Sequence, residues 1–400
     1  MKVLVAAHRL ELGGTQVNAV DLAAAVRDRH GVDVVFAAAT GPAAVLADER
    51  RLGLRELPDA TRHPSRARVR ALARLARAEN VDLVHAWDWP QCFDCYPDVY
   101  LRQRIPMLCT VMSMVVPSFI PRQLPTTFGT EQLAEQAAAK RSGPVDLLEP
   151  PVDTVANAPG VADAAEFRRR FRIGADQIAI VMVGRLEYWL KFDSLVRAIE
   201  AADALAAAPI RLVLVGEGSA AADVQARADE VNGRHGREVI TLTGGLIDPR
   251  PAYDAADIML GMGGSALRSL AFAKPLVVLG EQGFSRVLDH STVDLFCYQG
   301  WYGLGDGGPD DLVGQVKPLL DSPELRADLG AMGRDLVVRR FALDAAADRL
   351  WDTYQRVVSD RVRRSGALVE GARAAAMVAV GRAPDRVQKP LRALRKVVAR

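Results

Sequence analysis

The sequence predicts an α/β protein made of two doubly wound, Rossmann-like lobes that face each other across a cleft, and three observations support this fold. Short apolar runs alternate with helix-period segments along most of the chain, which is typical of βα units with parallel sheets. The alternation starts afresh near residue 177, after a segment at 149–160 that contains Pro150, Pro151 and Pro159. The length of 400 residues also exceeds what one hydrophobic core usually holds.

The first half of the chain is expected to form one parallel sheet with helices. The strand candidates are the apolar runs Lys2–Ala7, Val32–Ala39, Val81–Trp87, Pro106–Met112 and Val145–Pro151. The helix candidates are Thr15–Arg29, Arg66–Glu79 and Glu131–Lys140, with Thr15 as the expected N-cap of the first.

The second half repeats the pattern. Its strand candidates are Gln177–Gly184, Arg211–Gly216, Val239–Gly244, Asp257–Gly261, Pro275–Leu279 and Val293–Tyr298. We therefore predict an N-terminal lobe over 1–158, a second lobe over 159–340, a helix over 341–358 that returns to the first lobe, and a basic tail over 359–400. Open parallel sheets bind ligands at the carboxyl ends of their strands, so the loops that follow strands are the candidate sites.

Composition limits the possible function classes. Half of the residues are hydrophobic and a quarter are charged, which is typical of a globular protein. The formal net charge is only +2, so the chain as a whole has no strong positive field that would attract nucleic acid. The four cysteines form no disulfide framework, and the pair Cys92 and Cys95 lacks the further ligands of a zinc site. With no signal peptide and no apolar run of about 18 residues, we expect a cytoplasmic protein.

The C-terminal tail differs from the rest. Residues 361–400 contain eleven Lys and Arg but only two Asp and Glu, and Leu391, Leu394, Val397 and Val398 recur there at helical spacing. This pattern suits an amphipathic helix at the anionic inner face of a membrane, which would make the protein peripheral. It also suits a solvated or disordered tail, and a nucleic-acid role comes third because no recognition module accompanies it.

Three segments at expected strand ends have the composition of phosphate-binding loops. Gly13 and Gly14 precede the first helix, and glycines there allow close approach of a ligand to free N–H groups. Arg185 and Lys191 flank the next such loop and together suit a diphosphate. Gly263, Gly264, Ser265 and Ala266 form the third. The dinucleotide fingerprint G-x-G-x-x-G is absent, which disfavours a nicotinamide or flavin enzyme.

Several motifs occur along the chain at a specific spacing. They are Gly13-Gly14, Pro151-Val152-Asp153, Gly184-Arg185-Leu186 with Lys191, Leu214-Val215-Gly216-Glu217-Gly218, Tyr253-Asp254-Ala255-Ala256-Asp257, Leu267 to Pro275, and Leu319 to Arg326 leading to Arg340-Phe341. Over about residues 1–358, this set resembles the motifs of the family-4 glycosyltransferases of the GT-B fold. The resemblance implies a retaining transfer of a sugar from a nucleotide-diphosphate donor, without a cofactor or metal. No D-x-D metal motif is present.

The resemblance also implies roles for residues. Arg185 and Lys191 would neutralise the leaving diphosphate, and Gly14 would approach its phosphates. Leu246 would lie beside the nucleotide base. The donor-binding set would comprise Gly13, Gly14, Glu217, Leu246, Gly263, Gly264, Ser265, Ala266, Arg268 and Glu281.

This sequence departs from the family pattern at four positions. Gly261 and Arg268 stand where the family has two glutamates seven residues apart, and Arg286 stands at a further acidic position, with Glu281 as its substitute. Met112 replaces a histidine. These changes suggest either an acidic donor such as a uronic acid, or a protein that binds a sugar nucleotide and transfers it poorly.

The strand candidate Val81–Trp87 brings two further polar residues into view: His85 lies in the strand and Asp88 follows it. His85 is a candidate catalytic group, with a buried structural histidine as the alternative, and Asp88 is a candidate base on the acceptor side. Aromatic residues after this strand are a candidate acceptor wall. The sequence thus predicts a glycosyltransferase with an unidentified acceptor. A catalytically degenerate binding protein and a nucleotide-sugar epimerase or hydrolase are the alternatives.

Overall fold

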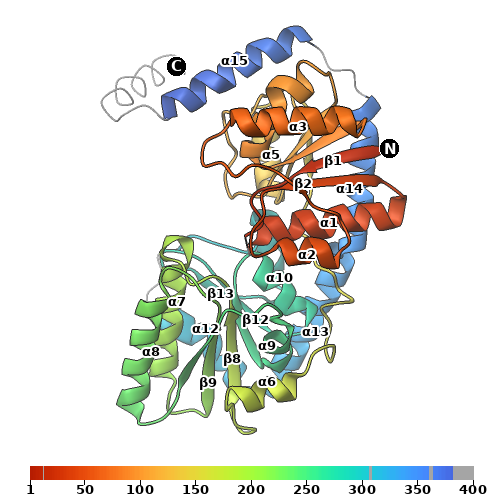
Figure 1. Ribbon diagram of the computed structural model, residues 1–400. Coiled ribbons are helices and arrows are strands. Elements are labelled where there is room, and N and C mark those ends of the chain that lie inside the picture. Colours follow the sequence, from red (N-terminus) through yellow and green to blue (C-terminus); the bar gives the residue numbers. More distant parts are fainter. Residues whose placement is uncertain (12, 306–308, 360–363, 382–400) are drawn as a thin grey trace. The chain divides into compact units, whose positions relative to one another are not determined.

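The computed structural model describes residues 1–11, 13–305, 309–359 and 364–381. Contacts divide the chain into two compact units. Unit 1 comprises Met1–Glu149 together with the residues from Ala346 onward, and unit 2 comprises Pro150–Ala345. Each unit contains one sheet covered by helices (Figure 1), so the doubly wound α/β fold predicted from the sequence is confirmed.

The sheet of unit 1 has seven described strands in the order β3-β2-β1-β4-β5-β6-β7, and all of their pairings are parallel. Their bounds are β1 Lys2–Ala6, β2 Asp33–Ala38, β3 Arg55–Glu56, β4 Leu83–Trp87, β5 Met107–Val111, β6 Thr126–Phe128 and β7 Val145–Leu147. The central strands β1, β4 and β5 are buried on both faces, which is why their sequences are continuous apolar runs.

The helices of unit 1 cover this sheet. They are α1 Gly14–His30, α2 Ala44–Glu49, α3 Arg66–Ala78, α4 Trp89–Cys95, the π-helix η1 Tyr96–Tyr100, α5 Glu131–Ala138, α14 Leu343–Ser359 and α15 Arg364–Gly381. The first three residues of α14, 343–345, are assigned to unit 2, and the rest of this helix, from Ala346, belongs to unit 1.

The sheet of unit 2 has six described strands in the order β10-β9-β8-β11-β12-β13, and only the β12–β13 pair is antiparallel. Their bounds are β8 Ile178–Val183, β9 Ile210–Val215, β10 Ile240–Gly244, β11 Ile258–Gly261, β12 Leu276–Leu279 and β13 Ser285–Val287. The helices are α6 Ala164–Arg170, α7 Tyr188–Ala204, α8 Ala221–His235, α9 Arg250–Ala255, α10 Gly264–Ala271, α11 Val293–Gln299, α12 Pro309–Asp321 and α13 Pro323–Arg340.

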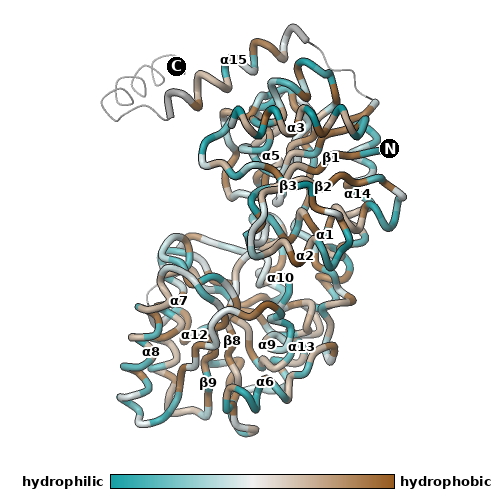
Figure 2. The backbone as a smooth tube through the Cα atoms, in the orientation of Figure 1, coloured by the Kyte–Doolittle hydropathy of each residue, from teal (hydrophilic) through white to brown (hydrophobic). Residues whose placement is uncertain are grey.

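Hydrophobic clusters cover both faces of the unit 2 sheet. One contains residues of α7, α8 and α12, and the other contains residues of α6, α9, α10 and α11. Figure 2 shows the same pattern, with mainly hydrophobic strands and with helices such as α8 that alternate hydrophilic and hydrophobic residues. The sheets are therefore interior layers that hold the loops at their edges in place.

Two local predictions were wrong. The segment Val293–Tyr298, expected as a strand, is the helix α11. Asp289 forms a turn ahead of it, and Val293, Phe296 and Cys297, which are spaced i, i+3 and i+4, pack against the core. The first helix starts at Gly14 with Gly13 as its N-cap, so Thr15 lies inside the first turn instead of capping it.

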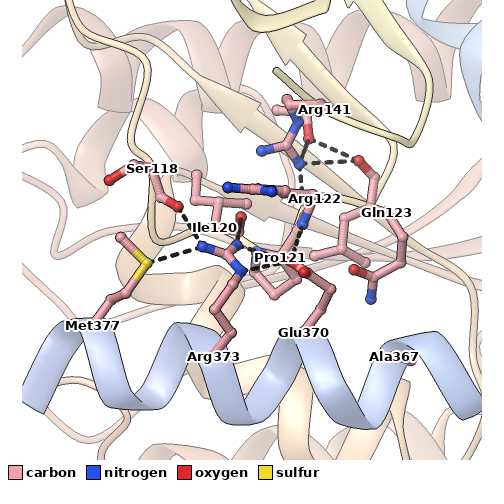
Figure 3. A network of polar contacts seen from close by, with 12 residues as sticks. Ser118, Ile120, Pro121, Arg122, Gln123, Arg141, Ala367, Glu370, Arg373 and Met377 are labelled. Atoms are coloured by element: carbon pink, nitrogen blue, oxygen red, sulfur yellow. Dashed lines mark hydrogen bonds and ion pairs between the residues drawn. The ribbon is translucent and has the colours of Figure 1, made fainter. Parts of the chain in front are cut away.

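The helix α15 is fastened to unit 1 by polar contacts (Figure 3). Arg373 donates from Nη1 to the carbonyl of Ser118 at 2.9 Å and from Nη2 to that of Ile120 at 3.2 Å. Glu370 accepts the N–H of Arg122 at 2.9 Å and pairs with Arg373. In the described part of the chain, α15 and the other helices are too short or too polar to cross a membrane. The predicted amphipathic positions Leu391, Leu394, Val397 and Val398 lie outside the described residues.

Candidate functional site

Backbone hydrogen bonds join the loops that follow β8 and β9 at the carboxyl edge of the unit 2 sheet. Leu186 donates its N–H to the carbonyl of Glu217 at 2.8 Å, and its own carbonyl accepts the N–H of Ala220 at 2.8 Å. A Cβ at Gly216 would lie 1.8 Å from the carbonyl oxygen of Gly184, and Gly216 has a φ of 149°. Only glycine fits there, so the glycine allows the loops after β8 and β9 to touch.

Arg185 and Lys191 line one small pocket at this edge. Leu190, with a φ of 68°, interrupts α7, so the regular helix begins beside Lys191. A left-handed conformation at a leucine is unfavourable, and it directs the chain so that Lys191 returns to the end of β8. The residues that line the pocket are Met182, Val183, Gly184, Arg185, Leu186, Lys191, Leu195, Met262 and Ser265.

The two cations have no anionic partner of their own. Among the described residues, neither Arg185 nor Lys191 has a hydrogen bond or an ion pair. Burial, assisted by the charge of Arg185, lowers the pKa of Lys191 to about 8. A half-buried ammonium beside a second cation is unfavourable, and an anion bound between the two would relieve that cost.

The start of α10 reaches the same pocket. Gly263, with a φ of 59°, is its N-cap and supplies no side-chain cap to the first turn. The hydroxyl of Ser265 donates to the carbonyl of Met262 at 3.0 Å, and both residues line the pocket. The N–H groups of the first turn of a helix have no partner inside it, and Gly263 and Gly264 are exposed. Of the predicted donor-binding residues, Ser265 thus lies with Arg185 and Lys191.

Gly261 has a structural explanation. A Cβ at this position would lie 3.3 Å from both the backbone nitrogen of Ala266 and the hydroxyl of Ser265. A glutamate here would therefore press on the start of α10. The glycine lets this helix end lie close to β11.

Three other predicted donor-binding residues, Glu217, Leu246 and Glu281, lie at this end of unit 2 but do not line the pocket. The carboxylate of Glu217 accepts the N–H of Gly245 at 3.1 Å, and the next residue, Leu246, is half-buried against the core. Glu281 accepts a hydrogen bond from the hydroxyl of Tyr302. These contacts hold the loops after β9, β10 and β12.

Arg268 lies on α10 beside Tyr253. Burial raises the pKa of the Tyr253 hydroxyl to about 12, and the charge of Arg268 opposes this shift. That hydroxyl is buried and has no hydrogen-bond partner among the described residues. Arg286, by contrast, is exposed on the edge strand β13.

In unit 1, Gly13 and Gly14 lie at the start of α1. Gly14 is exposed, and a Cβ added to it would meet nothing within 4 Å. The space above this helix end is open, as a ligand-binding role would require, and that role stays a prediction.

His85 lies in the interior of unit 1, where a ligand has no access to it. It is fully buried, its Nδ1 is 2.7 Å from the hydroxyl of Tyr354, and its Nε2 is 2.6 Å from that of Thr110. Burial lowers its pKa to about 3, so the ring is neutral. The candidate catalytic role is therefore not supported, and the structural alternative accounts for the residue.

Asp88 follows β4 and is partly exposed. It lies beside His8, which sequence reasoning did not select as a site residue. The signal in the sequence is position, because His8 comes two residues after the end of β1 and neighbouring parallel strands end at the same edge of a sheet. In the described residues, no group of three or more His, Cys, Asp or Glu side chains is arranged to hold a metal ion.

Two family models match the chain. Residues 12–141 match the model described as Glycosyltransferase Family 4, and residues 177–321 match the one described as Glycosyl transferases group 1. No curated protein matches the sequence.

Several solved structures share the fold. A glycosyltransferase from Rickettsia africae has 14% identity and a TM-score of 0.73, over 90% of this chain and 99% of that one. HepE from Anabaena in complex with UDP-glucose has 14% identity and a TM-score of 0.72, over 89% and 100%. UDP-GlcNAc 2-epimerase from Neisseria meningitidis has 10% identity and a TM-score of 0.60, over 89% and 100%.

Proposed function

We propose that unit 2 binds the diphosphate of a nucleotide-sugar donor at Arg185, Lys191 and the start of α10, in keeping with the two glycosyltransferase family models that match the chain and with its GT-B fold. The observation that carries this proposal is the pair of cations without anionic partners. The sugar then passes to a hydroxyl of an acceptor that unit 1 binds.

The chemistry follows from where charge develops. As the bond between the anomeric carbon and the phosphate oxygen breaks, the nucleoside diphosphate gains negative charge. The planar guanidinium of Arg185 offers two parallel hydrogen bonds, and Lys191 adds a compact charge. Both interactions strengthen in the transition state, so they accelerate the reaction as well as binding the donor.

The resemblance to family 4 supports two finer proposals, namely that the transfer retains the anomeric configuration and that it needs no metal. A uridine nucleotide is the first donor to test, because HepE and the epimerase were solved with UDP-sugars. Arg268 and Arg286 support testing UDP-glucuronate as well as neutral donors.

The experiment measures nucleoside diphosphate release from a panel of UDP-, GDP-, dTDP- and ADP-sugars, with and without hydroxyl acceptors and with EDTA. Release that depends on an acceptor and persists in EDTA is expected. Release that is equal without an acceptor identifies a hydrolase, interconversion of the sugar identifies an epimerase, and binding without turnover identifies a degenerate site. NMR of the product reports the anomeric configuration.

We also propose that the basic residues of 361–400 bring the protein to anionic membranes. Sedimentation with phosphatidylglycerol vesicles, compared with a chain truncated after Gly381, tests this proposal. Equal sedimentation of the two chains would contradict it.

A further inference from the structure

The helix α15 presents its apolar side to solvent, which is the reverse of an ordinary surface helix. Glu370 and Arg373 are directed at unit 1, and their side chains are only 20% and 24% exposed (Figure 3). Leu368 and Val369 are 60% and 69% exposed. Over residues 366–378, where burial is described, every exposed residue is a glycine, alanine, leucine or valine. The described part of the chain therefore leaves an apolar helix face open.

Close packing fixes this orientation of α15. Ala367 and Ala374 are fully buried, and a Cβ at Gly371 would lie 2.7 Å from the ring of Tyr96. The hydroxyl of Tyr96 donates to the carbonyl of Ala367 at 2.7 Å. Because small residues and the polar contacts of Arg373 hold the inner side of the helix against unit 1, the apolar side is kept outward.

A row of arginines lies on the helix α3. This helix has five arginines and no acidic residue. Arg66, Arg70 and Arg74 are exposed and recur every fourth residue, about 6 Å apart along the axis, so they share one side of the helix. Arg68 and Arg77 pair with aspartates, but the three arginines of the row have no hydrogen bond or ion pair with another described residue. Like charges at this spacing destabilise a helix, so helix stability does not account for the row.

The two helices belong to the same face of the unit 1 sheet. α3 contacts η1, and η1 contacts α15 through Tyr96. Leu72 of α3, Tyr96 and Ala367 of α15 are members of one hydrophobic cluster. Since the buried sides of both helices face this cluster, their exposed sides turn away from the sheet, and Figure 1 shows α15 beside α3. The arginine row and the apolar face are therefore parts of one outer surface, which we call the α3–α15 surface.

We propose that the α3–α15 surface docks unit 1 on an anionic lipid bilayer. The apolar side of α15 lies in the interfacial layer, and Arg66, Arg70 and Arg74 pair with headgroup phosphates. The inference rests on the membrane association proposed above for residues 361–400 and extends it from the tail to a folded surface. No described helix is suited to cross a membrane, so α15 lies in the plane of the bilayer. The chain that follows has a matching charge, because residues 382–400 contain seven Lys and Arg and one Asp.

The combination of charge and apolar surface selects a bilayer over other partners. A nucleic acid or an acidic glycan would pair with the arginines and leave Leu368 and Val369 in water. A second copy of this chain would cover the apolar face but would bring two arginine rows towards each other. An anionic bilayer satisfies both parts of the surface at once.

The first experiment measures sedimentation of the full chain with phosphatidylglycerol vesicles. The triple variant Arg66→Gln, Arg70→Gln and Arg74→Gln is expected to partition at least about tenfold more weakly, since each basic residue near an anionic surface contributes about fivefold. Phosphatidylcholine vesicles should bind the wild type no better than this variant. A matched control removes the same charge from exposed positions of unit 2 and should bind like the wild type. It is the triple variant Arg169→Gln, Lys317→Gln and Arg339→Gln.

The second experiment tests the apolar face. Leu368→Ser with Val369→Ser is expected to weaken partitioning at least about fivefold without lowering the Tm, because both side chains are exposed. Val155→Ser with Val161→Ser, at exposed positions of unit 2, is the control. All four native cysteines are buried, so an environment-sensitive dye can be attached selectively to Leu368→Cys. Its emission should shift to the blue on phosphatidylglycerol vesicles, and the same dye on Val155→Cys should not respond.

The outcomes separate this inference from the proposal for the tail. If the full chain does not sediment with anionic vesicles, both are wrong. If truncation after Gly381 abolishes binding while the α3 and α15 variants bind like the wild type, only this inference is overturned. If the truncated chain binds like the full chain and the α3 and α15 variants do not, this inference stands and the tail proposal is wrong. Weaker binding of the arginine variant alone, with no effect at Leu368 and Val369, would also overturn it, because the partner would then be a soluble polyanion.

Discussion

The phenolic hydroxyl of Tyr354 lies 2.7 Å from Nδ1 of His85, although 269 residues separate the two in the sequence. The contact fastens α14 to β4, the middle strand of the unit 1 sheet. It continues through Nε2 of His85 to Thr110 at 2.6 Å and from there to Thr127 at 2.7 Å. A buried chain of hydrogen bonds therefore joins the C-terminal part of the chain to three neighbouring strands.

Replacing Tyr354 with phenylalanine is expected to destabilise unit 1 by about 1–3 kcal/mol, because it leaves Nδ1 of His85 buried without a partner. Chemical denaturation followed by circular dichroism measures the change. Tyr188→Phe is the control, because its hydroxyl bonds to Asp223 at an exposed position and its loss should cost less than about 0.5 kcal/mol. Equal effects of the two changes would contradict the structural role of His85.

Unit 1 is expected to lose stability in mild acid. Burial lowers the pKa of His85 from its ordinary value of 6.5 to about 3 in the folded protein, so below pH 6.5 the unfolded chain binds a proton that the folded chain does not. The free energy of unfolding should fall by up to about 1.4 kcal/mol per pH unit from pH 6.5 down towards pH 3. Urea unfolding at pH 7.5, 6.0 and 5.0 tests this, and His85→Gln should lack this contribution.

The contact of α15 with residues 118–122 gives a third prediction. Arg373→Ala removes donors to the carbonyls of Ser118 and Ile120, so hydrogen exchange in residues 113–124 should become faster (Figure 3). Arg102→Ala, which removes only an exposed pair with Asp98, is the control. Exchange that is unchanged in both variants would show that α15 does not stabilise this segment.

Lys191→Met is expected to stabilise unit 2 while it weakens donor binding. The lowered pKa of Lys191 means that the fold disfavours its charge, and removing that charge should add roughly 1–3 kcal/mol at pH 7. For the same reason, wild-type stability should rise as the pH increases from about 8 towards 10.5. Thermal unfolding at pH 7 and 9.5 checks both expectations, and a lower Tm for Lys191→Met at pH 7 would contradict them.

The sequence was most informative where local pattern decides structure. The apolar strand runs and the glycines after them predict both sheets, and the loop after β8 predicts that Arg185 and Lys191 lie together, as they do in the pocket that they line. The strand prediction for Val293–Tyr298 was wrong because a short, mostly apolar segment fits a strand and a buried helix equally well.

The sequence pattern does not predict contacts between residues that are far apart in the chain. Nothing near His85 in the sequence indicates that Tyr354 occupies its Nδ1, and nothing near His8 indicates that Asp88 ends the neighbouring strand with its side chain directed at the ring. The short strands β3, β6 and β13 have two or three residues each, which is too few for an alternation of apolar and polar residues to reveal them in the sequence.

Calorimetric titration of nucleoside diphosphates tests the central claim, that Arg185 and Lys191 form the diphosphate site. UDP, GDP, dTDP and ADP are titrated at pH 7 into the wild type, Arg185→Ala, Lys191→Ala and the control Lys317→Ala, which removes an exposed lysine of unit 2. We expect one nucleotide to bind the wild type and the control equally, and each site variant at least tenfold more weakly, since a charged hydrogen bond is worth about 1.5–3 kcal/mol. Binding to the wild type should weaken above pH 8 as Lys191 loses its proton. Equal affinity in all four proteins, or no binding of any nucleotide to the wild type, would contradict the claim.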